Sequence, residues 1–220
     1  MDQKIALFQE LAELYKRNGH QLFMVGGSVR DYLLNIPLSD MDLVTDATPI
    51  EEKSFLENAD YTFERFGTVK LKYRDVKFDI ATFRKEAGYV DLRHPNVVEF
   101  SKNIKEDFSR RDITINALYL DSDLHVIDYV NGVKDLKNKV IKMVGNPQKR
   151  ISEDPLRIIR IYRFKLDLDF AIDKELEQVI NQNKDLLTKL RKEKILEEIH
   201  KCHHQDELKK ILNNFGINNL

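Results

Sequence analysis

Residues 26–45 read GGSVRDYLLNIPLSDMDLVT. The two glycines precede a helix predicted over 28–34, and Asp40 and Asp42 fall on or beside a strand predicted over 41–44. Glycine lets the backbone turn tightly and approach a ligand, and the first N–H groups of a helix attract anions. Side chains two positions apart on a strand share a face, so the two aspartates would project together. The segment therefore predicts a phosphate site beside a site for divalent cations.

The residues of this segment have separate expected roles. Gly26 and Gly27 would allow a phosphate to approach, and Arg30, one helical turn later, would add a forked positive charge. Mg²⁺ binds few carboxylates, and two such ions can hold the attacking and leaving oxygens of a phosphoryl transfer. Either half alone is equally compatible with a helix cap followed by a polar turn. Both halves within twenty residues favour an enzyme that transfers nucleotidyl groups.

Charge is distributed unevenly along a chain that is nearly neutral overall. The 220 residues carry a formal net charge of -1, are 33% charged and 42% hydrophobic, and can form one large domain or two small ones. Residues 1–60 contain eleven acidic and five basic side chains, a balance of -6; residues 134–165 contain ten basic and three acidic ones, a balance of +7. A local basic segment suits a phosphodiester backbone, with a solvated lysine-rich helix face as the alternative.

Cysteine usage and the N-terminus indicate the compartment. The single Cys202 excludes an internal disulfide and fits a reducing environment. Residues 1–10 contain early acids and no long apolar run, which predicts a helix rather than a signal peptide. No stretch reaches the length of a transmembrane span, so a cytoplasmic protein is expected. His203 and His204 are adjacent, whereas ligands on one helix face lie three or four apart, and a solvated helix end is expected there.

Hydrophobic periodicity predicts a mixed α/β portion followed by a helical portion. The expected helices are 3–17, 28–34 and 49–58, and the expected strands are 21–25, 41–44, 67–73 and 77–82, the last two as a hairpin. Residues 84–109 show little periodicity, which predicts a functional or mobile segment. Residues 113–120 are predicted as a helix, with 124–129 as a helix or strand beside it. After residue 133 the strand signals stop and helical spacing continues.

Further acids and bases extend the predicted chemistry. Asp79 alternates with the apolar Phe78 and Ile80, so it would supply a third acid beside the first two, unless it is simply an exposed strand position. Arg111, next to another arginine, suits a triphosphate through charge-assisted bonds. Asp112 could accept a hydrogen bond from a ribose hydroxyl. A surface ion pair is the alternative for this charged run.

The sequence EDPLR, residues 153–157, predicts the start of a helix with acids in its first turn. Asp154 and Arg157 are three apart, so they would share a face and present one acceptor beside a fork of donors. This pair complements the exocyclic amine and ring-nitrogen acceptor that cytosine and adenine share, and it mismatches uracil and guanine. A capped helix with a helical ion pair is the alternative.

Taken in order, these motifs resemble the class II tRNA nucleotidyltransferases, which include CCA-adding enzymes, A-adding enzymes and bacterial poly(A) polymerases. The resemblance covers about residues 20 to 200 and rests on 26–31, 40–42, 110–112, 153–157 and 191–198. Residues 83–89 and 93–95 resemble the family's flexible loop, and 130–147 resembles its hinge. The resemblance implies an α+β fold, with a polymerase β-like nucleotidyltransferase head in residues 1–140. A helical neck and the start of a body would follow in residues 141–220.

The resemblance also implies roles for individual residues. Two-metal catalysis would use Mg²⁺ bound by Asp40 and Asp42, with Asp79 as the third catalytic acid. A single nucleotide pocket would select CTP and ATP without a template. The nucleotide-binding residues would be Gly26, Gly27, Arg30 and Arg111 for the phosphates, Asp112 for the ribose, Asp154 and Arg157 for the base, and Arg160 and Arg163 nearby. Glu193, Lys194 and Ile195 would stabilise the neck, with Lys194 in place of an expected arginine.

The expected activity is addition of CCA, or of its terminal A, to tRNA 3′ ends. CC-only addition is disfavoured, because the loop that such members lack is present in this sequence. A bacterial poly(A) polymerase is the nearest alternative, and a non-catalytic RNA- or nucleotide-binding module would be expected to lack the acids. Such enzymes usually continue through body and tail domains beyond the position of Leu220. Either a truncated chain or a minimal enzyme that holds RNA through its basic neck is therefore expected, of undetermined oligomeric state.

Overall fold

The computed structural model describes residues 3–39, 41–89 and 95–218. It divides into two compact units. The first unit comprises Met1–Ala87, Val97–Arg111 and Ile115–Gly132, and the second comprises Gly88–Asn96, Asp112–Thr114 and Val133–Leu220. Throughout the described ranges, no helix combines the length and apolar character that crossing a bilayer requires.

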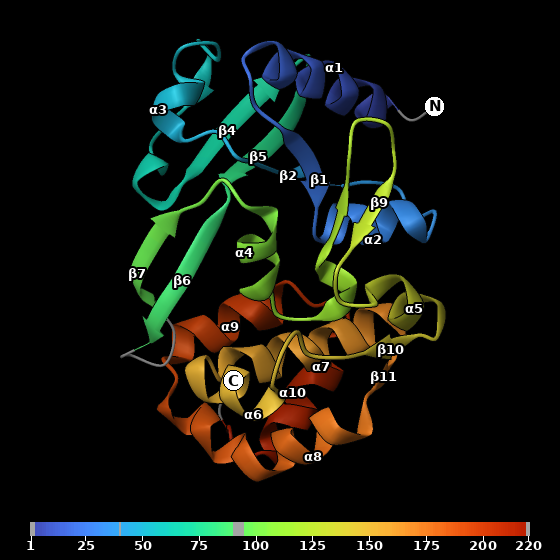
Figure 1. Cartoon of the computed structure of the whole chain (residues 1–220). Helices are drawn as coiled ribbons and strands as arrows, with labels where there is room; N and C mark the ends of the chain where they lie inside the picture. The colour runs from blue at the N-terminus through green and yellow to red at the C-terminus, as the bar shows by residue number, and fades with distance from the viewer. Residues whose placement is uncertain (1–2, 40, 90–94, 219–220) are drawn as a thin grey trace. The chain divides into compact units, whose positions relative to one another are not determined.

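Among the described residues, the first unit forms a seven-stranded sheet with the order β3-β4-β5-β2-β1-β8-β9 (Figure 1). Its neighbouring strands are antiparallel except for β2 and β5, which run parallel. The strands are β1 (Leu22–Val25), β2 (Met41–Thr45), β3 (Ala59–Asp60), β4 (Thr68–Tyr73), β5 (Val76–Thr82), β8 (Leu118–Leu120) and β9 (Val126–Asp128). The predicted hairpin is confirmed as β4 and β5.

Apolar periodicity explains which faces of these elements are buried. Helix α1 (Gln3–Arg17) buries Phe8 and Tyr15 together with the other apolar positions of its 3.6-residue repeat. In β5, Phe78 and Ile80 are fully buried while Asp79 is exposed, as strand alternation predicts. The helix predicted after the glycine pair is confirmed as α2 (Gly27–Leu33).

The helix predicted over 49–58 is shorter than expected. Helix α3 (Pro49–Glu52) begins with a capping box between Thr48 and Glu51 and ends after about one turn. Its last residue, Glu52, is buried and accepts a hydrogen bond from the Tyr15 hydroxyl. The Ser54 hydroxyl donates to the carbonyl oxygen of Glu51. This local side-chain bond competes with a further helical turn.

The segment 84–109, which shows little periodicity, contains three regular elements. β6 (Arg84–Tyr89) and β7 (Pro95–Phe100) form a two-stranded sheet, and α4 (Ile104–Ser109) follows. The Nη1 atom of Arg84 donates to the Phe66 carbonyl oxygen at 2.8 Å. A Cβ atom on Gly67 would lie 2.6 Å from the Phe100 ring, so this positive-φ position requires glycine. Arg84 of β6 is therefore hydrogen-bonded to Phe66, and the Phe100 ring of β7 packs closely against Gly67.

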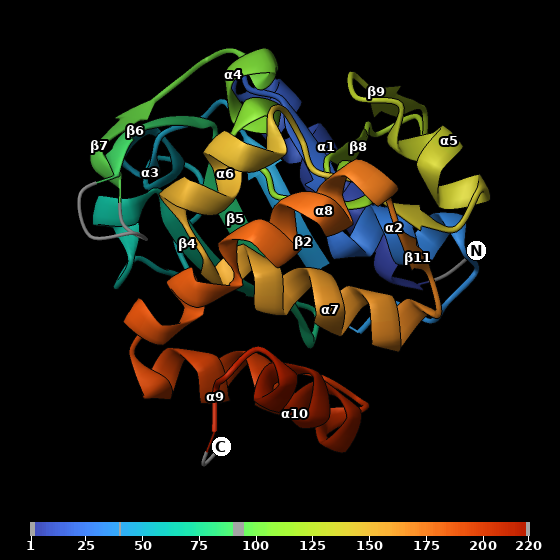
Figure 2. The same cartoon turned by 90° about the horizontal axis from the view of Figure 1, so that it is seen from below.

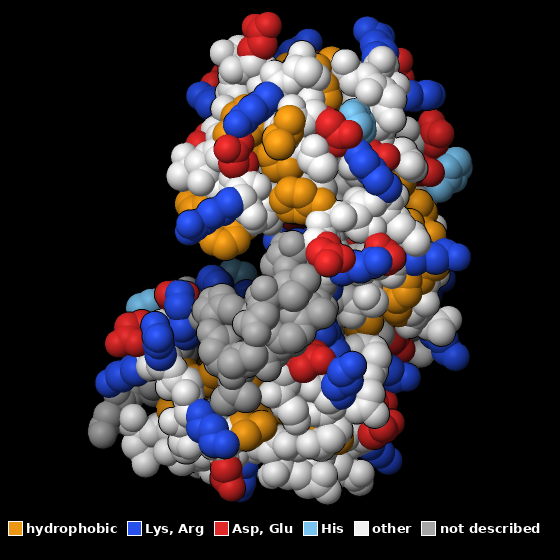
Figure 3. All heavy atoms as spheres, turned by 60° about the vertical axis from the view of Figure 1, so that its left-hand side comes forward, with side chains coloured by type: hydrophobic (Ala, Val, Ile, Leu, Met, Phe, Trp, Pro, Cys, Tyr) orange, Lys and Arg blue, Asp and Glu red, His pale blue; other side chains and the backbone are white. Residues whose placement is uncertain are grey.

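Hydrophobic side chains also reach the surface of the first unit, between charged ones (Figure 3). Residues Phe63, Phe66 and Phe100 are 44%, 46% and 41% exposed. The Arg65 guanidinium lies 4.5 Å from the centre of the Phe66 ring. The base of β6 and β7 therefore lies beside partly exposed aromatic rings.

The prediction of a helix over 113–120 is wrong. Residues Thr114–Asn116 form a single 3₁₀ turn, and Leu118–Leu120 form strand β8. Every residue from Ile113 to Leu120 is buried. A segment buried on all sides has neither the helical nor the strand alternation that separates the two structures.

The second unit is mainly helical (Figures 1 and 2). Its helices are α5 (Gly132–Lys137), α6 (Pro147–Glu153), α7 (Leu156–Leu168), α8 (Lys174–Asn183), α9 (Lys192–His200) and α10 (Gln205–Asn214). Helix α7 contacts α6, α9 and α10 and buries the apolar Ile158 and Ile161. β10 (Val140–Ile141) and β11 (Ala171–Ile172) form a short parallel pair. The expectation that strands end before residue 133 is therefore wrong, because two-residue strands leave no alternation in sequence.

Cys202 lies in the connection between α9 and α10 and is buried. Its Sγ donates to Asp167 Oδ1 at 3.4 Å, and the same oxygen accepts the N–H of His203 at 2.8 Å. Burial raises the pKa of the Cys202 thiol to about 11. His203 and His204 are exposed in this connection, as the sequence predicts.

Candidate active site

Gly26 forms the turn between β1 and α2 and borders two other predicted site residues. Its φ of 70° and ψ of -134° belong to a region that side-chain-bearing residues avoid. A Cβ atom at this position would lie 3.7 Å from Arg111 Nη1 and 3.9 Å from Asp42 Oδ2. The structure therefore brings a glycine turn, a guanidinium group and a carboxylate together within the first unit.

The first turn of α2 is connected to the rest of the site by polar bonds. Arg30 Nε and Nη2 lie 2.8 and 2.7 Å from Asp31 Oδ1, and Arg30 Nη1 donates to Asn116 Oδ1 at 2.9 Å. A Cβ atom on Gly27 would lie 3.5 Å from Arg30 Nη2, so the guanidinium packs against this glycine. Ser28 Oγ accepts the N–H of Asp42 at 3.0 Å, which attaches α2 to β2.

Asp42 and Asp79 are paired in register on the parallel strands β2 and β5. Side chains at paired positions project from the same face of a sheet. Both aspartates are exposed, whereas the apolar residues on either side of them are buried on the other face. The predicted third acid is therefore next to Asp42. Asp40, the other predicted metal ligand, lies outside the described residues.

A buried acid that the sequence reasoning missed, Asp107 on α4, orients Arg111. Asp107 Oδ2 accepts from Arg111 Nη2 at 2.9 Å and from the Tyr119 hydroxyl at 2.7 Å. The Tyr119 oxygen accepts from Arg111 Nε at 2.9 Å, and Asp107 Oδ1 accepts from Arg110 Nε at 2.8 Å. The spacing of Asp107, Arg110 and Arg111, three and four apart, is the signal that could have revealed this helical cluster.

Charge rather than burial controls the ionisation of this cluster. Burial alone would raise the pKa of Asp107, but the positive charges of Arg111 and Arg110 outweigh it and lower the pKa to about 2. Burial would lower the pKa of Arg111, but the charge of Asp107 reverses this and raises it. Asp107 therefore stays ionised and holds Arg111 with its Nη1 near Gly26.

In the second unit, Arg160 on α7 orients Asp112. Arg160 Nε and Nη2 donate to Asp112 Oδ2 at 2.8 and 2.6 Å, and the N–H of Ile113 donates to Oδ1 at 2.8 Å. Burial would raise the pKa of Asp112, but the Arg160 charge outweighs it and lowers the pKa. Asp112 is thus an ionised hydrogen-bond acceptor, as the ribose role requires.

Glu198 on α9 connects the two predicted arginines of α7. Its carboxylate lies 3.7 Å from Arg160 Nη1, 3.3 Å from Arg163 Nε and 2.8 Å from Lys201 Nζ. Burial lowers the pKa of Arg163, and the charge of Glu198 partly opposes this. One buried carboxylate in the 191–198 segment therefore holds both arginines against α9. The nearby Ile195 is also buried.

The helix start predicted at 153–157 needs correction. Glu153 is the last residue of α6, Asp154 is extended, and α7 begins at Leu156. The residue before a proline avoids helical geometry, which explains the break before Pro155. Asp154 Oδ1 accepts the N–H of Leu156 at 3.1 Å, so it caps α7 from outside the helix.

Arg157 is buried within the second unit. Its Nη1 donates to the Arg150 carbonyl oxygen at 2.5 Å and lies 3.6 Å from Glu153 Oε2. Backbone and carboxylate contacts thereby restrict the guanidinium. Base recognition by Asp154 and Arg157 stays a prediction.

Another group of possible metal ligands lies in the turn between β8 and β9. Asp121, Asp123 and His125, between β8 and β9, have ligand atoms within 4.8 Å of one another. Asp121 Oδ1 also accepts the N–H groups of Asp123 and His125 at 2.9 and 2.8 Å. These bonds are typical of a polar turn, so the group does not replace Asp42 and Asp79.

Comparison with known proteins identifies the family of the chain. Residues 22–142 match the model of the poly A polymerase head domain. The chain belongs to this family. Within the family, a CCA-adding enzyme of Lactobacillus helveticus is 45% identical over 183 residues, which are 83% of this chain and 46% of that protein. The chain spans about half the length of the curated relatives it matches.

Solved structures of the family have the same fold. A crystal structure of the Bacillus stearothermophilus CCA-adding enzyme in complex with CTP matches with a TM-score of 0.88 at 29% identity, covering 99% of this chain and 54% of that one. The Thermotoga maritima CCA-adding enzyme complexed with tRNA matches with a TM-score of 0.77 at 27% identity, covering 98% and 52%. The family resemblance and the α+β fold with a mixed sheet are thereby confirmed.

The donor set of this family member fits a divalent cation. Hard cations such as Mg²⁺ prefer carboxylate oxygens, and Asp42 and Asp79 offer two exposed carboxylates on one face. Two like charges placed side by side repel each other unless a positive charge lies near them. The glycine at position 26 also leaves the space beside Asp42 Oδ2 open to a ligand.

Proposed function

We propose that this chain contains the catalytic and nucleotide-binding parts of a template-independent RNA nucleotidyltransferase. It would add CCA, or its terminal A, to tRNA 3′ ends from CTP and ATP. The observation that carries the proposal is the in-register pair of Asp42 and Asp79 beside the Gly26 turn and Arg111. The similarity to CCA-adding enzymes over 83% of the chain supports it.

The first unit, with a proposed head over residues 1–140, would bind the triphosphate. Arg111 is already fixed by Asp107 and Tyr119, so little side-chain freedom is lost when it binds phosphate oxygens. Arg30 and the glycine pair would hold the remaining phosphates. Asp40 and Asp42, the expected metal ligands, would hold Mg²⁺, which when bound stabilises the charge on the attacking and leaving oxygens. Asp79, expected as the third catalytic acid, would also face this ion, because it is paired in register with Asp42.

The second unit, with a proposed neck over residues 141–220, would recognise the rest of the nucleotide. Asp112, held ionised by Arg160, would accept a hydrogen bond from the ribose hydroxyl. Asp154 and Arg157 would read the base, and Arg163 would add positive charge. The basic segment 134–165 would contact the RNA backbone. A cytoplasmic location belongs to the proposal, because a lone cysteine fits a reducing compartment.

The test is a ladder of product lengths on a tRNA that lacks its CCA end. CTP alone should add only cytidines, and both nucleotides should complete CCA. For an A-adding enzyme, only a tRNA that already ends in CC should be extended, by a single adenosine. Loss of incorporation in Asp42→Asn, with unchanged thermal unfolding, would tie the activity to this site. Incorporation of UTP as readily as CTP would contradict base reading by Asp154 and Arg157.

Poly(A) polymerase activity is the second candidate, because the matching family model is that of the poly A polymerase head domain. It predicts a long ladder with ATP alone. A non-catalytic binding module predicts no incorporation by the wild-type chain under any nucleotide mixture. The three outcomes are distinguishable on one gel.

A further inference from the structure

A lysine lies at the end of the carboxylate pair in the first unit. Strand β5 lies between β2 and β4, so Asp79 is paired in register with Asp42 on one side and with Lys70 on the other. Side chains at paired positions share a face. Asp42, Asp79 and Lys70 therefore lie in a row across three strands. We call the two aspartates of this row the carboxylate row.

Lys70 contacts the middle member of this row directly. Its Nζ lies 3.3 Å from Oδ1 and 3.5 Å from Oδ2 of Asp79. The two side chains are 47% and 52% exposed. An ion pair this exposed contributes little to the stability of the fold, because solvent screens it. The main effect of the Lys70–Asp79 pair is therefore to offset the negative charge of Asp79 at the site.

We infer that Lys70 is a positioning residue that competes with divalent cations for Asp79 and so weakens cation binding to the carboxylate row. The inference rests on the proposed function, in which these carboxylates hold Mg²⁺. Without a cation, Lys70 neutralises one of two adjacent like charges. A cation that binds must share Asp79 with the ammonium group or displace it. The cation then binds tightly only together with a second negative group, such as a nucleotide triphosphate.

Lys72 provides a matched control on the same strand and the same face. It lies two residues from Lys70 and is paired in register with Lys77 rather than with an aspartate. Its Nζ contacts Asp75 Oδ1 at 2.8 Å. Lys72→Met therefore removes the same charge from the same face without changing the carboxylate row.

The test is Mn²⁺ binding to the whole chain without nucleotide, measured from the electron paramagnetic resonance signal of free Mn²⁺. Lys70→Met should bind Mn²⁺ about three- to tenfold more tightly than the wild type, since a competing positive charge is removed. Lys70→Arg should stay within about twofold of the wild type because the charge remains. Lys72→Met should show less than half of the Lys70→Met effect. In an Asp79→Asn background, Lys70→Met should change nothing.

Equal Mn²⁺ affinity of Lys70→Met and the wild type would overturn the inference, as would equal tightening by Lys72→Met. An unchanged thermal unfolding midpoint in Lys70→Met separates the effect from a structural one. A separate variant tests the underlying proposal: if Asp42→Asn binds Mn²⁺ as the wild type does, the metal role of the row fails. Impaired binding in Asp42→Asn with no response to Lys70→Met removes only the inference about Lys70.

Discussion

Asp107 and Glu52 are both buried in the first unit, with 0% and 1% of their surface exposed, yet they differ in charge. Burial acts on both, but the Arg111 and Arg110 charges outweigh it at Asp107 and lower that pKa to about 2. Glu52 accepts a hydrogen bond from the Tyr15 hydroxyl, and burial raises its pKa to about 8. The identity of the partner, rather than the depth of burial, decides whether a buried acid is ionised.

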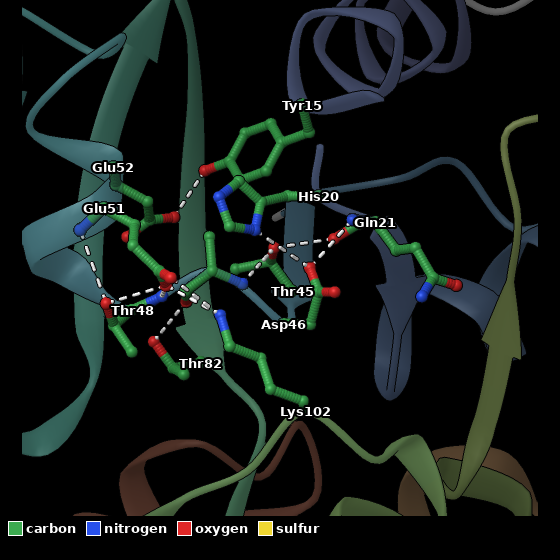
Figure 4. Close-up of polar contacts among 11 residues, drawn as sticks. Tyr15, His20, Gln21, Thr45, Asp46, Thr48, Glu51, Glu52, Thr82 and Lys102 are labelled. Carbon is green, nitrogen blue, oxygen red and sulfur yellow. Dashed lines mark hydrogen bonds and ion pairs between the residues drawn. The ribbon is translucent and has the colours of Figure 1, made fainter. Parts of the chain in front are cut away.

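The two acids accordingly have different structural uses. Asp107 uses its charge to orient Arg111, whereas neutral Glu52 joins α3 to α1 through Tyr15. Figure 4 shows that Glu52 points to Tyr15 while its neighbour Glu51 points to Thr48 and Lys102. The Lys102 contact, together with Thr48, lowers the pKa of Glu51 to about 2. Adjacent residues on one short helix therefore hold opposite protonation states at neutral pH.

The largest expected effect is that of Asp107→Asn. This change leaves Arg111 and Arg110 in place without the carboxylate that neutralises them, and breaking a buried pair in this way costs about 3–5 kcal/mol. Urea unfolding at pH 7 measures the loss. Asp75→Asn, in an exposed pair with Lys72, is the control and should lower the free energy of unfolding far less than Asp107→Asn does. Similar small losses in both variants would contradict the comparison.

The pH dependence of Glu52 should be the next largest effect. The folded-state pKa of about 8 lies above the ordinary value of 4.5, so the folded protein retains a proton that the unfolded chain releases. Stability relative to Glu52→Gln should therefore fall by a few kcal/mol as pH rises from about 5 to 8. The pH dependence due to Asp107 has the opposite sign. Its contribution to stability is present above pH 3.8, the ordinary pKa of an aspartate, and is lost as the pH falls towards 2.

Urea unfolding of the wild type and Glu52→Gln at pH 5, 6.5 and 8 checks the Glu52 prediction. Glu57→Gln, at an exposed position five residues later, controls for the loss of a carboxylate charge. A stability difference between the wild type and Glu52→Gln that stays constant over this range would show that Glu52 is ionised in the folded protein.

Arg111→Lys tests what the Asp107 side of the comparison does for the proposed activity. A lysine cannot contact both Asp107 and Tyr119 while extending a third group towards Gly26. The kcat/KM for CTP should fall about ten- to a hundredfold. Arg110→Lys keeps a charge on Asp107 from a residue outside the predicted site, and should have a smaller effect. Equal losses in the two variants would assign Arg111 a structural role only.

Tyr15→Phe should have the smallest effect. It removes the hydroxyl that donates to a neutral carboxyl group, which should cost about 1 kcal/mol at pH 6. Tyr73→Phe is the control, since that hydroxyl donates to Glu10 on the surface. A loss above about 3 kcal/mol would indicate that Glu52 is charged, because hydrogen bonds to charged groups are stronger.

Segments with one buried face were predictable from sequence, and fully buried segments were not. α1 and the β4–β5 hairpin have clear periods, and their positions agree with prediction to within a few residues. The strand after Asn116 and the two-residue strands β10 and β11 carry no readable period. Asp154 is extended rather than helical, because the residue before a proline avoids helical geometry, and the acid-rich pattern of 153–157 does not show this break.

Residues expected to contact a ligand are easier to predict from the sequence than the residues that orient them. Arg111 and Asp112 belong to short motifs, whereas Asp107 and Glu198 orient arginines across helices and acquire that role only through tertiary contacts. Lys70 requires the register of β4 on β5, which no local pattern specifies. The supporting residues of a site depend on packing, so sequence periodicity alone does not reveal them.

The buried thiol of Cys202 makes the chain a convenient starting point for chemical labelling. The thiolate is the form that attacks an alkylating reagent, and burial keeps this sulfur protonated, with a pKa of about 11. A cysteine introduced at an exposed position, such as Lys77 on β5, would react far faster than the native one. A single fluorophore or spin label could therefore be attached beside the carboxylate row without first removing Cys202 from its contact with Asp167.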